Sequence, residues 1–258
     1  MANVLITGCR GGIGLDAAQR LAARGHTIYA TVHSESSIAG TKTTFGPKAG
    51  NVTVEKLDIT SPVDREKAGG WDIDVLINNA ALGDSGPLAE IDMDRLKRPM
   101  EVNVFSALEL TRRFIPSMAA KKRGRIIFIG SIAGLIPTPF LAPYGMTKFA
   151  LEGLVFALRT ELKPFGIHVV MVNPGGYNTA FNQLNIGKKY DWIERSVLYR
   201  DHMDYIKKAE NMITGSELQS TASIANQIVK AVEDKRPRRR YVAPLRQWLA
   251  VPLIRELG

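Results

Sequence analysis

Residues 3–25 read NVLITGCRGGIGLDAAQRLAARG, and they join a buried strand to a helix through a glycine-rich turn. The apolar run 3–8 is typical of a strand that ends at Gly8, and 15–25 has helical spacing and stops at Gly25. Glycines in such a turn let the backbone approach a ligand closely, and the free N–H groups of a helix N-terminus favour a phosphate. At the first strand-to-helix crossing of a parallel sheet, this arrangement predicts a dinucleotide site.

The same alternation of short apolar runs and longer helical patterns continues along the chain. Strands that are apolar throughout and alternate with helices indicate a parallel sheet covered on both faces. We therefore predict an α/β fold: a single-domain, Rossmann-type doubly wound parallel sheet spanning residues 1–258. Further strands are expected at 27–32, 52–59, 73–80, 124–131, 167–175 and 240–244, and further helices at about 91–120, 142–165 and 221–234.

Residues 177–220 break this alternation. They form a long insertion, with several aromatic and Met residues, between a strand and the next helix. Insertions of this length in a compact domain are usually functional, so we expect a lid over the substrate. The alternative is an extra helical pair that packs against the domain edge.

Composition and charge restrict the classes of protein that fit. The 258-residue chain has a net charge of +9 and one cysteine, Cys9, so no intrachain disulfide forms, which suits a cytoplasmic location. It opens with no signal peptide, and no apolar run approaches the roughly 20 residues of a membrane span. The basic run KRPRRR at 235–240 lacks a nucleic-acid motif, so we expect a solvated turn and no nucleic-acid partner. The positive charge would attract a phosphorylated cofactor.

Two further motifs follow predicted strands. Asn78-Asn79-Ala80-Ala81 would line the crevice at the carboxyl edge of the sheet, although alone it would indicate only a polar turn. Ser131 ends the strand 124–131 and precedes YGMTK at 144–148. Positions four apart lie on nearly one helix face, so Lys148 is expected beside Tyr144.

That pairing has a chemical consequence. A nearby cation favours phenolate, so Lys148 would lower the pKa of Tyr144, which could then give or take a proton at working pH. Ser131 would hold a carbonyl oxygen. Without its context, Tyr-x-x-x-Lys is more typical of an ordinary pair on a helix surface.

In the order of these motifs the chain resembles the short-chain dehydrogenase/reductase family. The matching pieces are TGCRGGIG, LDI at 57–59, NNAA, VNV at 102–104, GS at 130–131, YGMTK and NPGGYNT at 173–179, within roughly residues 3–244. The resemblance implies a catalytic tetrad of Asn103, Ser131, Tyr144 and Lys148. Tyr144 would be the general acid/base, and Lys148 would bind the nicotinamide ribose. Ser131 would orient the substrate oxygen, and Asn103 would hold a water of a proton relay.

The resemblance also implies where a nicotinamide cofactor binds, and it implies no metal. The adenine would lie near Asp58, Asn79 would line the cofactor path, and the segment with Thr179 would border the nicotinamide. The complete expected set of cofactor-binding residues is Gly8, Arg10, Gly12, Ile13, Gly14, His33, Asp58, Ile59, Asn79, Ala80, Tyr144, Lys148, Pro174, Gly175 and Thr179.

The end of the second strand indicates which cofactor is used. An acid there selects the ribose 2′-hydroxyl, whereas a cation accommodates a 2′-phosphate. Val32 occupies the family's usual acid position, His33 follows it, and Arg10 in the glycine-rich turn could reach the same phosphate. We therefore predict NADP(H) over NAD(H). The negative charge of the adjacent Glu35 opposes this prediction. The alternative for His33 is a plain loop residue with no cofactor contact.

The segment between Ser131 and Tyr144 predicts the substrate class. It is almost wholly apolar, which suits a small apolar or aromatic carbonyl or alcohol substrate. IYATVH at 28–33 and the stretch 144–181 look most like the steroid and retinol dehydrogenase branch, although broad carbonyl reductases share these words. The lid is expected to add Tyr177, Phe181, Leu184, Tyr190 and Trp192 to the pocket.

Other functions and assemblies fit parts of this pattern. A non-catalytic nicotinamide-binding sensor or scaffold could use the same fold, but it would not need the complete tetrad. A sugar-nucleotide epimerase or dehydratase would need a larger C-terminal domain than this chain offers. The apolar C-terminal segment 246–258 favours subunit packing over membrane contact, because Pro252 interrupts it, so we expect a homodimer or homotetramer.

Overall fold

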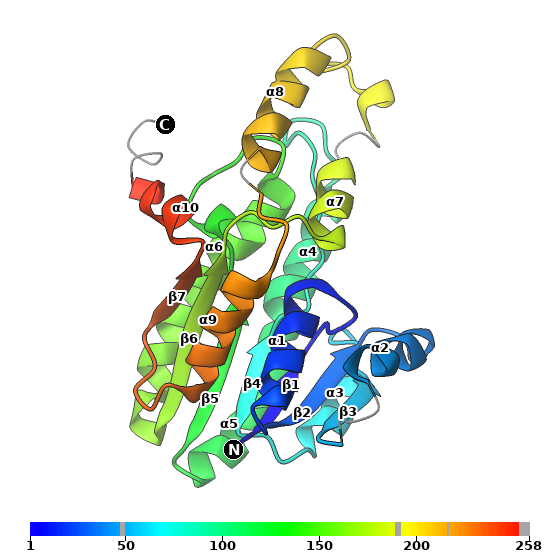
Figure 1. Ribbon diagram of the computed structural model, residues 1–258. Coiled ribbons are helices and arrows are strands. Elements are labelled where there is room, and N and C mark those ends of the chain that lie inside the picture. The colour runs from blue at the N-terminus through cyan, green and yellow to red at the C-terminus, as the bar shows by residue number, and fades with distance from the viewer. Residues whose placement is uncertain (47–49, 189–191, 216, 253–258) are drawn as a thin grey trace.

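Seven apolar runs pair as parallel strands in the computed structural model, which describes residues 1–46, 50–188, 192–215 and 217–252. The order across the sheet is β3-β2-β1-β4-β5-β6-β7, and every neighbouring pair is parallel (Figure 1). The predicted fold class is therefore confirmed. The strands are β1 (Asn3–Ile6), β2 (Thr27–Val32), β3 (Val52–Lys56), β4 (Val75–Asn78), β5 (Gly124–Ile129), β6 (Ile167–Pro174) and β7 (Arg240–Ala243).

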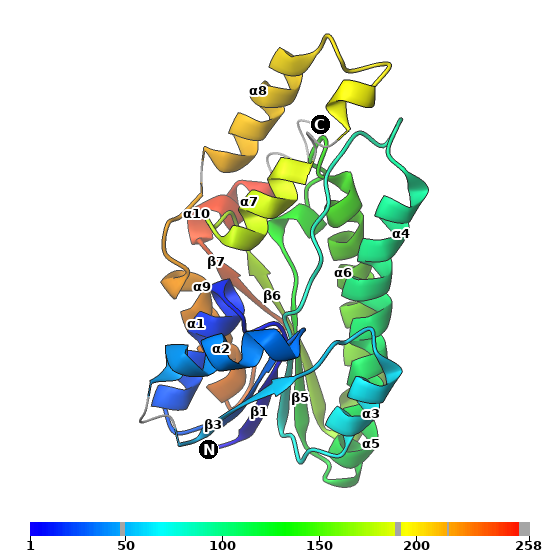
Figure 2. The same cartoon turned by 90° about the vertical axis from the view of Figure 1, so that its right-hand side faces the viewer.

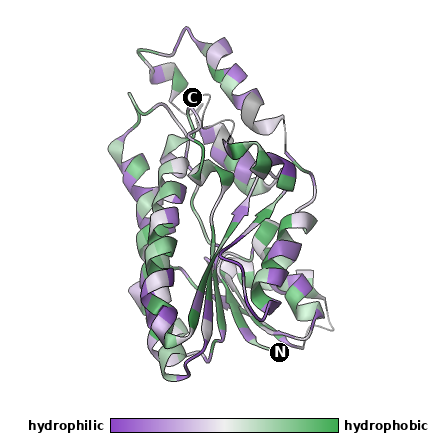
Figure 3. Ribbon diagram, turned by 90° about the vertical axis from the view of Figure 1, so that its left-hand side faces the viewer, coloured by the Kyte–Doolittle hydropathy of each residue, from purple (hydrophilic) through white to green (hydrophobic). Residues whose placement is uncertain are grey.

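Helices cover both faces of this sheet (Figure 2). One face carries α1 (Gly12–Ala23), α2 (Ile38–Phe45) and α9 (Ala222–Glu233), and the other carries α3 (Pro62–Gly69), α5 (Ala107–Ala120) and α6 (Ala142–Leu162). The neighbours Leu5 and Ile6 belong to the two different apolar clusters, because successive side chains of a strand point to opposite faces. Figure 3 shows hydrophobic and hydrophilic residues in bands along the flanking helices, as expected when one side meets the sheet and the other meets water.

The helix expected at about 91–120 has an irregular centre. It is built from α4 (Met93–Met100), the π-helical η2 (Glu101–Ser106) and α5, which follow one another without a break. A π-helical turn widens the backbone spiral and often marks a functional site. Asn103 lies in this turn.

The chain order places the ends of the strands where a crevice is expected. From the central β1 the chain runs outward through β2 and β3, then crosses to β4 on the other side of β1. Ligands of open α/β sheets bind at such a switch point, outside the carboxyl ends of the strands. Short 3-10 turns follow several strands and helices: η1 (Glu35–Ser37), η3 (Ile132–Gly134) and η4 (Lys163–Phe165).

The insertion after β6 stands beyond the carboxyl ends of the strands (Figure 1). It contains α7 (Ala180–Gly187), the turn η6 (Ile193–Arg195) and α8 (Met203–Thr214). Positions 189–191 and 216 of the expected lid, including Tyr190, lie outside the described residues, as do 253–258 of the C-terminal segment. After β7, α10 (Leu245–Leu249) closes the described chain, and no helix of the described ranges has the length and hydropathy needed to cross a bilayer.

Candidate active site

The glycine-rich turn after β1 is held by Asn79 at the end of β4. The Asn79 Nδ2 group donates hydrogen bonds to the carbonyl oxygens of Thr7 (2.8 Å) and Gly8 (3.1 Å). A Cβ atom on Gly14 would lie 2.4 Å from that same nitrogen, so only glycine fits there. Gly8 has a φ of +74°, a backbone conformation that also favours glycine. Asn79 therefore holds the shape of the glycine-rich turn, whereas the sequence predicted only that Asn79 would line the cofactor path.

The turn faces the segment that follows β6. A Cβ atom on Gly12 would meet the Thr179 methyl group at 3.8 Å, which places these two predicted cofactor residues opposite each other. The first turn of α1 holds no acidic residue, and no side chain caps its N-terminal N–H groups. Such an uncapped helix end beside a glycine turn fits the pyrophosphate of a dinucleotide.

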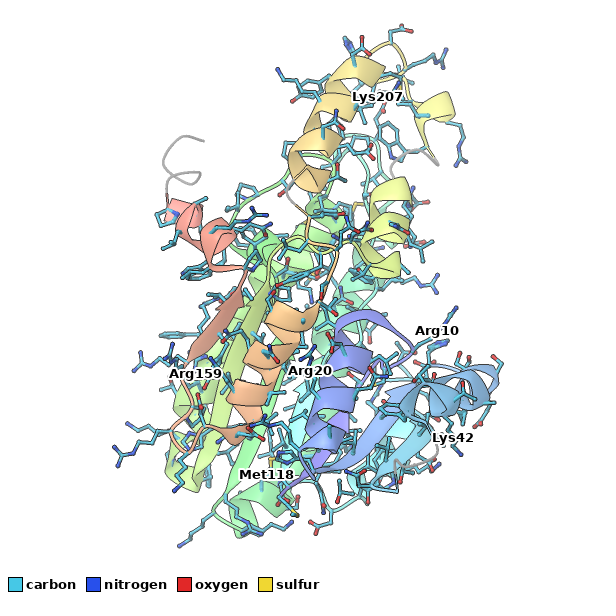
Figure 4. The ribbon with its side chains drawn as sticks, viewed as in Figure 1. Arg10, Arg20, Lys42, Met118, Arg159 and Lys207 are labelled. Carbon is cyan, nitrogen blue, oxygen red and sulfur yellow. The ribbon has the colours of Figure 1, made fainter. Side chains whose placement is uncertain are left out.

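The predicted adenine side lies at the ends of β2 and β3. The His33 Nε2 atom is 3.4 Å from a carboxylate oxygen of Asp58, and His33 is 83% exposed. Arg10 is exposed, and Figure 4 shows it extending from the turn above α2, on which Lys42 is labelled. Ile59, by contrast, is 5% exposed and packs in the core, so its side chain offers little surface to a cofactor.

Ser131, Tyr144 and Lys148 meet at the carboxyl end of β5. The Ser131 hydroxyl accepts a hydrogen bond from the Ala133 N–H (3.1 Å) and hydrogen-bonds to the Tyr144 phenol. Lys148 lies one turn along α6, with its Nζ atom 5.3 Å from the centre of the Tyr144 ring. Its Nζ donates to the carbonyl oxygen of Ile129 at 2.8 Å. All three side chains are buried.

Burial dominates the proton affinities of this cluster. It raises the pKa of Tyr144 above its ordinary value, and the hydrogen bond from Ser131 offsets part of that rise. It lowers the pKa of Lys148 to about 7. The predicted fall of the Tyr144 pKa is therefore wrong for this structure, because the loss of solvent raises it.

Both ends of the Asn103 side-chain amide hydrogen-bond to protein groups. Its Nδ2 donates to the Leu82 carbonyl oxygen (2.9 Å) and to the Thr147 hydroxyl (3.0 Å), and its Oδ1 accepts from the Leu82 N–H (2.7 Å). Thr147 in turn donates to the Tyr144 carbonyl oxygen (2.7 Å). Asn103 thus joins η2 to the helix that carries Tyr144, and a water held by its side chain stays a prediction.

The predicted pocket residues divide into three groups. Phe181 packs edge-on against Tyr144, with ring centres 5.6 Å apart, and Trp192 packs near Tyr199 in the insertion. Leu184 is 70% exposed. Tyr177 is a correction: it is 2% exposed, belongs to the core on the α1 and α9 face, and hydrogen-bonds to Ser223 (2.8 Å).

The sequence did not predict that Phe140 contacts two aromatic rings of the insertion. Phe140 meets Tyr199 and Tyr205 edge-on, with ring centres 5.5 and 5.9 Å apart. Phe140 has a φ of +62°, which is uncommon for a residue other than glycine. The aromatic content of the insertion indicated that such contacts could form, but it did not show which rings would meet.

Known proteins are similar to this chain over most of its length. A family model described as short chain dehydrogenase matches residues 2–189. The chain is 30% identical to 17-beta-hydroxysteroid dehydrogenase type 1 of Homo sapiens, over 98% of this chain and 79% of that protein. It is also 30% identical to retinol dehydrogenase 8 of Bos taurus, over 91% of this chain and 79% of that protein.

Solved structures share the same architecture. A short-chain dehydrogenase/reductase from Burkholderia phymatum in complex with NAD aligns with a TM-score of 0.81 at 20% identity, covering 98% of this chain and 92% of that one. A short-chain dehydrogenase from Sphingobium yanoikuyae in complex with NADPH aligns with a TM-score of 0.76 at 23% identity, covering 99% and 94%. At these identities the likeness supports the fold alone.

Proposed function

The chain belongs to the short-chain dehydrogenase family, and we propose that within it the protein is an NADP(H)-dependent oxidoreductase for apolar or aromatic ketones and their secondary alcohols. The observation that carries this proposal is the buried cluster of Ser131, Tyr144 and Lys148, which lies at the same carboxyl edge of the sheet as the glycine-rich turn. A buried phenol hydrogen-bonded to a serine hydroxyl is suited to binding and protonating a carbonyl oxygen.

The direction of proton movement follows from the electrostatics. Because burial raises the pKa of Tyr144, its phenol carries a proton at neutral pH and can donate it to a carbonyl oxygen. Ser131 would hydrogen-bond to that same oxygen. When bound, the nicotinamide cofactor supplies the hydride that completes reduction to the alcohol. Lys148 uses one of its N–H groups on Ile129, which leaves others for the hydroxyls of a ribose.

The preference for NADP(H) rests on the charge at the end of β2. Arg10 is an exposed cation in the turn, and Val32, which occupies the family's acid position, is buried and apolar. The Asp58 carboxylate lies close to His33 and would repel a phosphate there, so Arg10 is the stronger candidate for a 2′-phosphate.

The substrate class rests on the apolar surroundings of Tyr144 and on the relatives. Leu141, Ala133 and Phe181 cluster around Tyr144. The two relatives named above are, by their names, a hydroxysteroid and a retinol dehydrogenase, whose substrates are bulky and apolar. We propose that the insertion 177–220 covers a substrate of that kind.

A substrate panel tests this function. NADPH consumption would be followed with aryl ketones, a steroid ketone, retinal and a sugar, and we expect turnover of the apolar carbonyl compounds but not of the sugar. Tyr144→Phe removes the proton and should lower kcat by about 10²–10⁴-fold while the protein still binds NADPH. Unchanged ketone reduction by this variant would exclude the site and favour a sensor or scaffold.

We further propose that the protein is a homo-oligomer, with a contact on the outer face of α4 and α6. Met146, Phe149 and Phe156 are exposed at helical spacing along α6, by 46, 41 and 68%. Met93 and Phe105 are also exposed and line a groove with Met146. An apolar stripe of this length on a helix favours a protein partner over solvent. The sequence placed the contact in the C-terminal segment instead.

A further inference from the structure

Residues 196–198 of the insertion are tied to the loop after β4 by one carboxylate, that of Glu90. Its Oε1 accepts hydrogen bonds from the N–H groups of Val197 and Leu198, both at 2.9 Å. Its Oε2 accepts the Ser196 hydroxyl at 2.5 Å. A carboxylate that binds three donors from consecutive residues fixes that backbone turn in place, since charge-assisted hydrogen bonds are the stronger class.

The turn at 196–198 also fixes the backbone of Tyr199, an aromatic residue of the insertion. The Ser196 hydroxyl donates a hydrogen bond to Glu90, and its oxygen accepts one from the Tyr199 N–H at 2.8 Å. The Tyr199 ring packs edge-on against Trp192 and Phe140, with ring centres 6.0 and 5.5 Å apart. Glu90 is therefore connected through Ser196 to the aromatic group of the insertion.

Phe140 is hydrogen-bonded to the same loop that carries Glu90. Its carbonyl oxygen accepts a hydrogen bond from the Gly86 N–H at 2.7 Å, four residues before Glu90. Phe140 has a positive φ, and a non-glycine residue keeps such a conformation only where its surroundings hold it. It lies four residues before Tyr144 and directly precedes Leu141, which belongs to the apolar cluster around Tyr144.

We propose that Glu90 is a positioning residue that holds Tyr199 and Trp192 against Phe140, so that this aromatic group binds the bulky apolar part of the substrate. This inference rests on the proposed function for its substrate, but the connection from Glu90 to the insertion does not. Glu90 touches neither Tyr144 nor Ser131 in any contact described above, so it acts on substrate binding through Ser196 and Tyr199.

A second set of contacts holds the first part of the insertion independently. The Ser85 hydroxyl donates to the Asn185 carbonyl oxygen (2.5 Å), and the Lys188 Nζ donates to the Gly83 carbonyl oxygen (2.8 Å). These contacts keep α7, and with it Phe181, next to Tyr144 when Glu90 is removed. Loss of Glu90 should therefore release residues 192–199 without dismantling the catalytic cluster.

The test compares Glu90→Ala, Glu90→Gln and Ser196→Ala with a matched control, Glu161→Ala. Glu161 is an exposed glutamate near the end of α6, remote from the insertion. Trypsin reports directly on the lid, because Arg200 is exposed just after the turn held by Glu90. Cleavage within the exposed basic turn 235–239 serves as the internal reference.

We expect Glu90→Ala to speed cleavage after Arg200 about 10-fold relative to the reference, Glu90→Gln to have a smaller effect, and Glu161→Ala to have none. In NADPH-dependent reduction of 1-tetralone, Glu90→Ala should raise KM about 10-fold and change kcat less than about 2-fold. The KM for cyclopentanone, which is too small to need the aromatic group, should not change. The double variant Glu90→Ala/Ser196→Ala should be no worse than Glu90→Ala alone, because both act through one connection.

Unchanged cleavage after Arg200 in Glu90→Ala would overturn the role of Glu90 in holding the insertion. Faster cleavage with an equal rise of KM for both ketones, or additive effects of the two substitutions, would overturn its role in positioning the aromatic group. If the wild type reduces neither ketone, the proposed function fails, while the cleavage rates still decide whether Glu90 holds residues 192–199.

Discussion

The Lys148 Nζ atom donates a hydrogen bond to the Ile129 carbonyl oxygen at 2.8 Å, although Lys148 shares a face of α6 with Tyr144. This contact joins α6 to the last residue of β5, two positions before Ser131. The amine is thereby fixed in a buried position 5.3 Å from the centre of the Tyr144 ring. Its proton affinity is consequently set by burial, and this has a measurable effect on stability.

Lys148→Met should stabilise the cofactor-free protein most at neutral pH and least at alkaline pH. Burial lowers the pKa of Lys148 from 10.5 to about 7, so between these values the unfolded chain holds a proton that the folded chain lacks. The contribution of Lys148 to stability therefore rises with pH, by about 1.4 kcal/mol per pH unit. Thermal unfolding from about pH 7 to about pH 10 should show the advantage of Lys148→Met shrinking as pH rises.

An exposed lysine provides the control for this measurement. Lys230→Met on α9 should show no such pH-dependent difference from the wild type. A difference between Lys148→Met and wild type that stays constant across the range would mean that Lys148 keeps its ordinary pKa in the folded chain.

Arg10→Ala should discriminate between the two nicotinamide cofactors. If Arg10 binds the 2′-phosphate, its loss should lower kcat/KM with NADPH about 10-fold and change kcat/KM with NADH less than about 2-fold. Lys42→Ala, an exposed cation on the neighbouring α2, is the control for a general loss of positive charge. Steady-state kinetics with both cofactors measures the effect, and an equal loss with NADPH and NADH would rule out the phosphate role of Arg10.

The sequence was sufficient to predict the sheet and the meeting of Ser131, Tyr144 and Lys148. The short apolar stretches within 3–8 and 124–131 favour buried strands, and parallel strands bring their carboxyl ends together. That is why Ser131 lies beside Tyr144, as expected. Helical spacing likewise placed Lys148 next to Tyr144.

What the sequence could not supply depends on three-dimensional burial. The spacing of Tyr144 and Lys148 does not show how much solvent each loses, and that loss reverses the expected direction of the Tyr144 pKa. Tyr177 lies within the stretch NPGGYNT at 173–179, which was expected to border the nicotinamide, yet its side chain belongs to the core on the α1 and α9 face. Glu90 had no local pattern at all, because its three donors come from residues more than a hundred positions away.

Phe156→Glu should dissociate the proposed oligomer without affecting the cluster of Ser131, Tyr144 and Lys148. Phe156 is 68% exposed on the apolar stripe of α6, far along the helix from Tyr144. A charge in a packed apolar interface is costly, so the mass in sedimentation equilibrium should fall to that of a monomer. Phe165→Glu places the same charge on another exposed phenylalanine outside the stripe and should leave the mass unchanged. If Phe156→Glu keeps the wild-type mass, the contact lies elsewhere or the protein is a monomer.

Gly14→Ala should destabilise the glycine-rich turn in the cofactor-free protein. The added methyl group would lie 2.4 Å from the Asn79 Nδ2 atom and 2.8 Å from the Gly8 carbonyl oxygen, so the hydrogen bonds from Asn79 to the turn must break or shift. We expect a loss of about 1–3 kcal/mol in the free energy of unfolding, measured with urea. NADPH binding should weaken as well, because the shape of the turn depends on Asn79.

Gly11→Ala is the matched control, since a Cβ atom at Gly11 would meet nothing within 4 Å. Its backbone is extended, with a φ of −178°, so alanine adopts it readily. The stability of the cofactor-free Gly11→Ala protein should therefore equal that of the wild type, whereas Gly14→Ala should be less stable. Equal stability of both variants would show that Asn79 can move aside, and the turn would then owe its shape to the glycines alone.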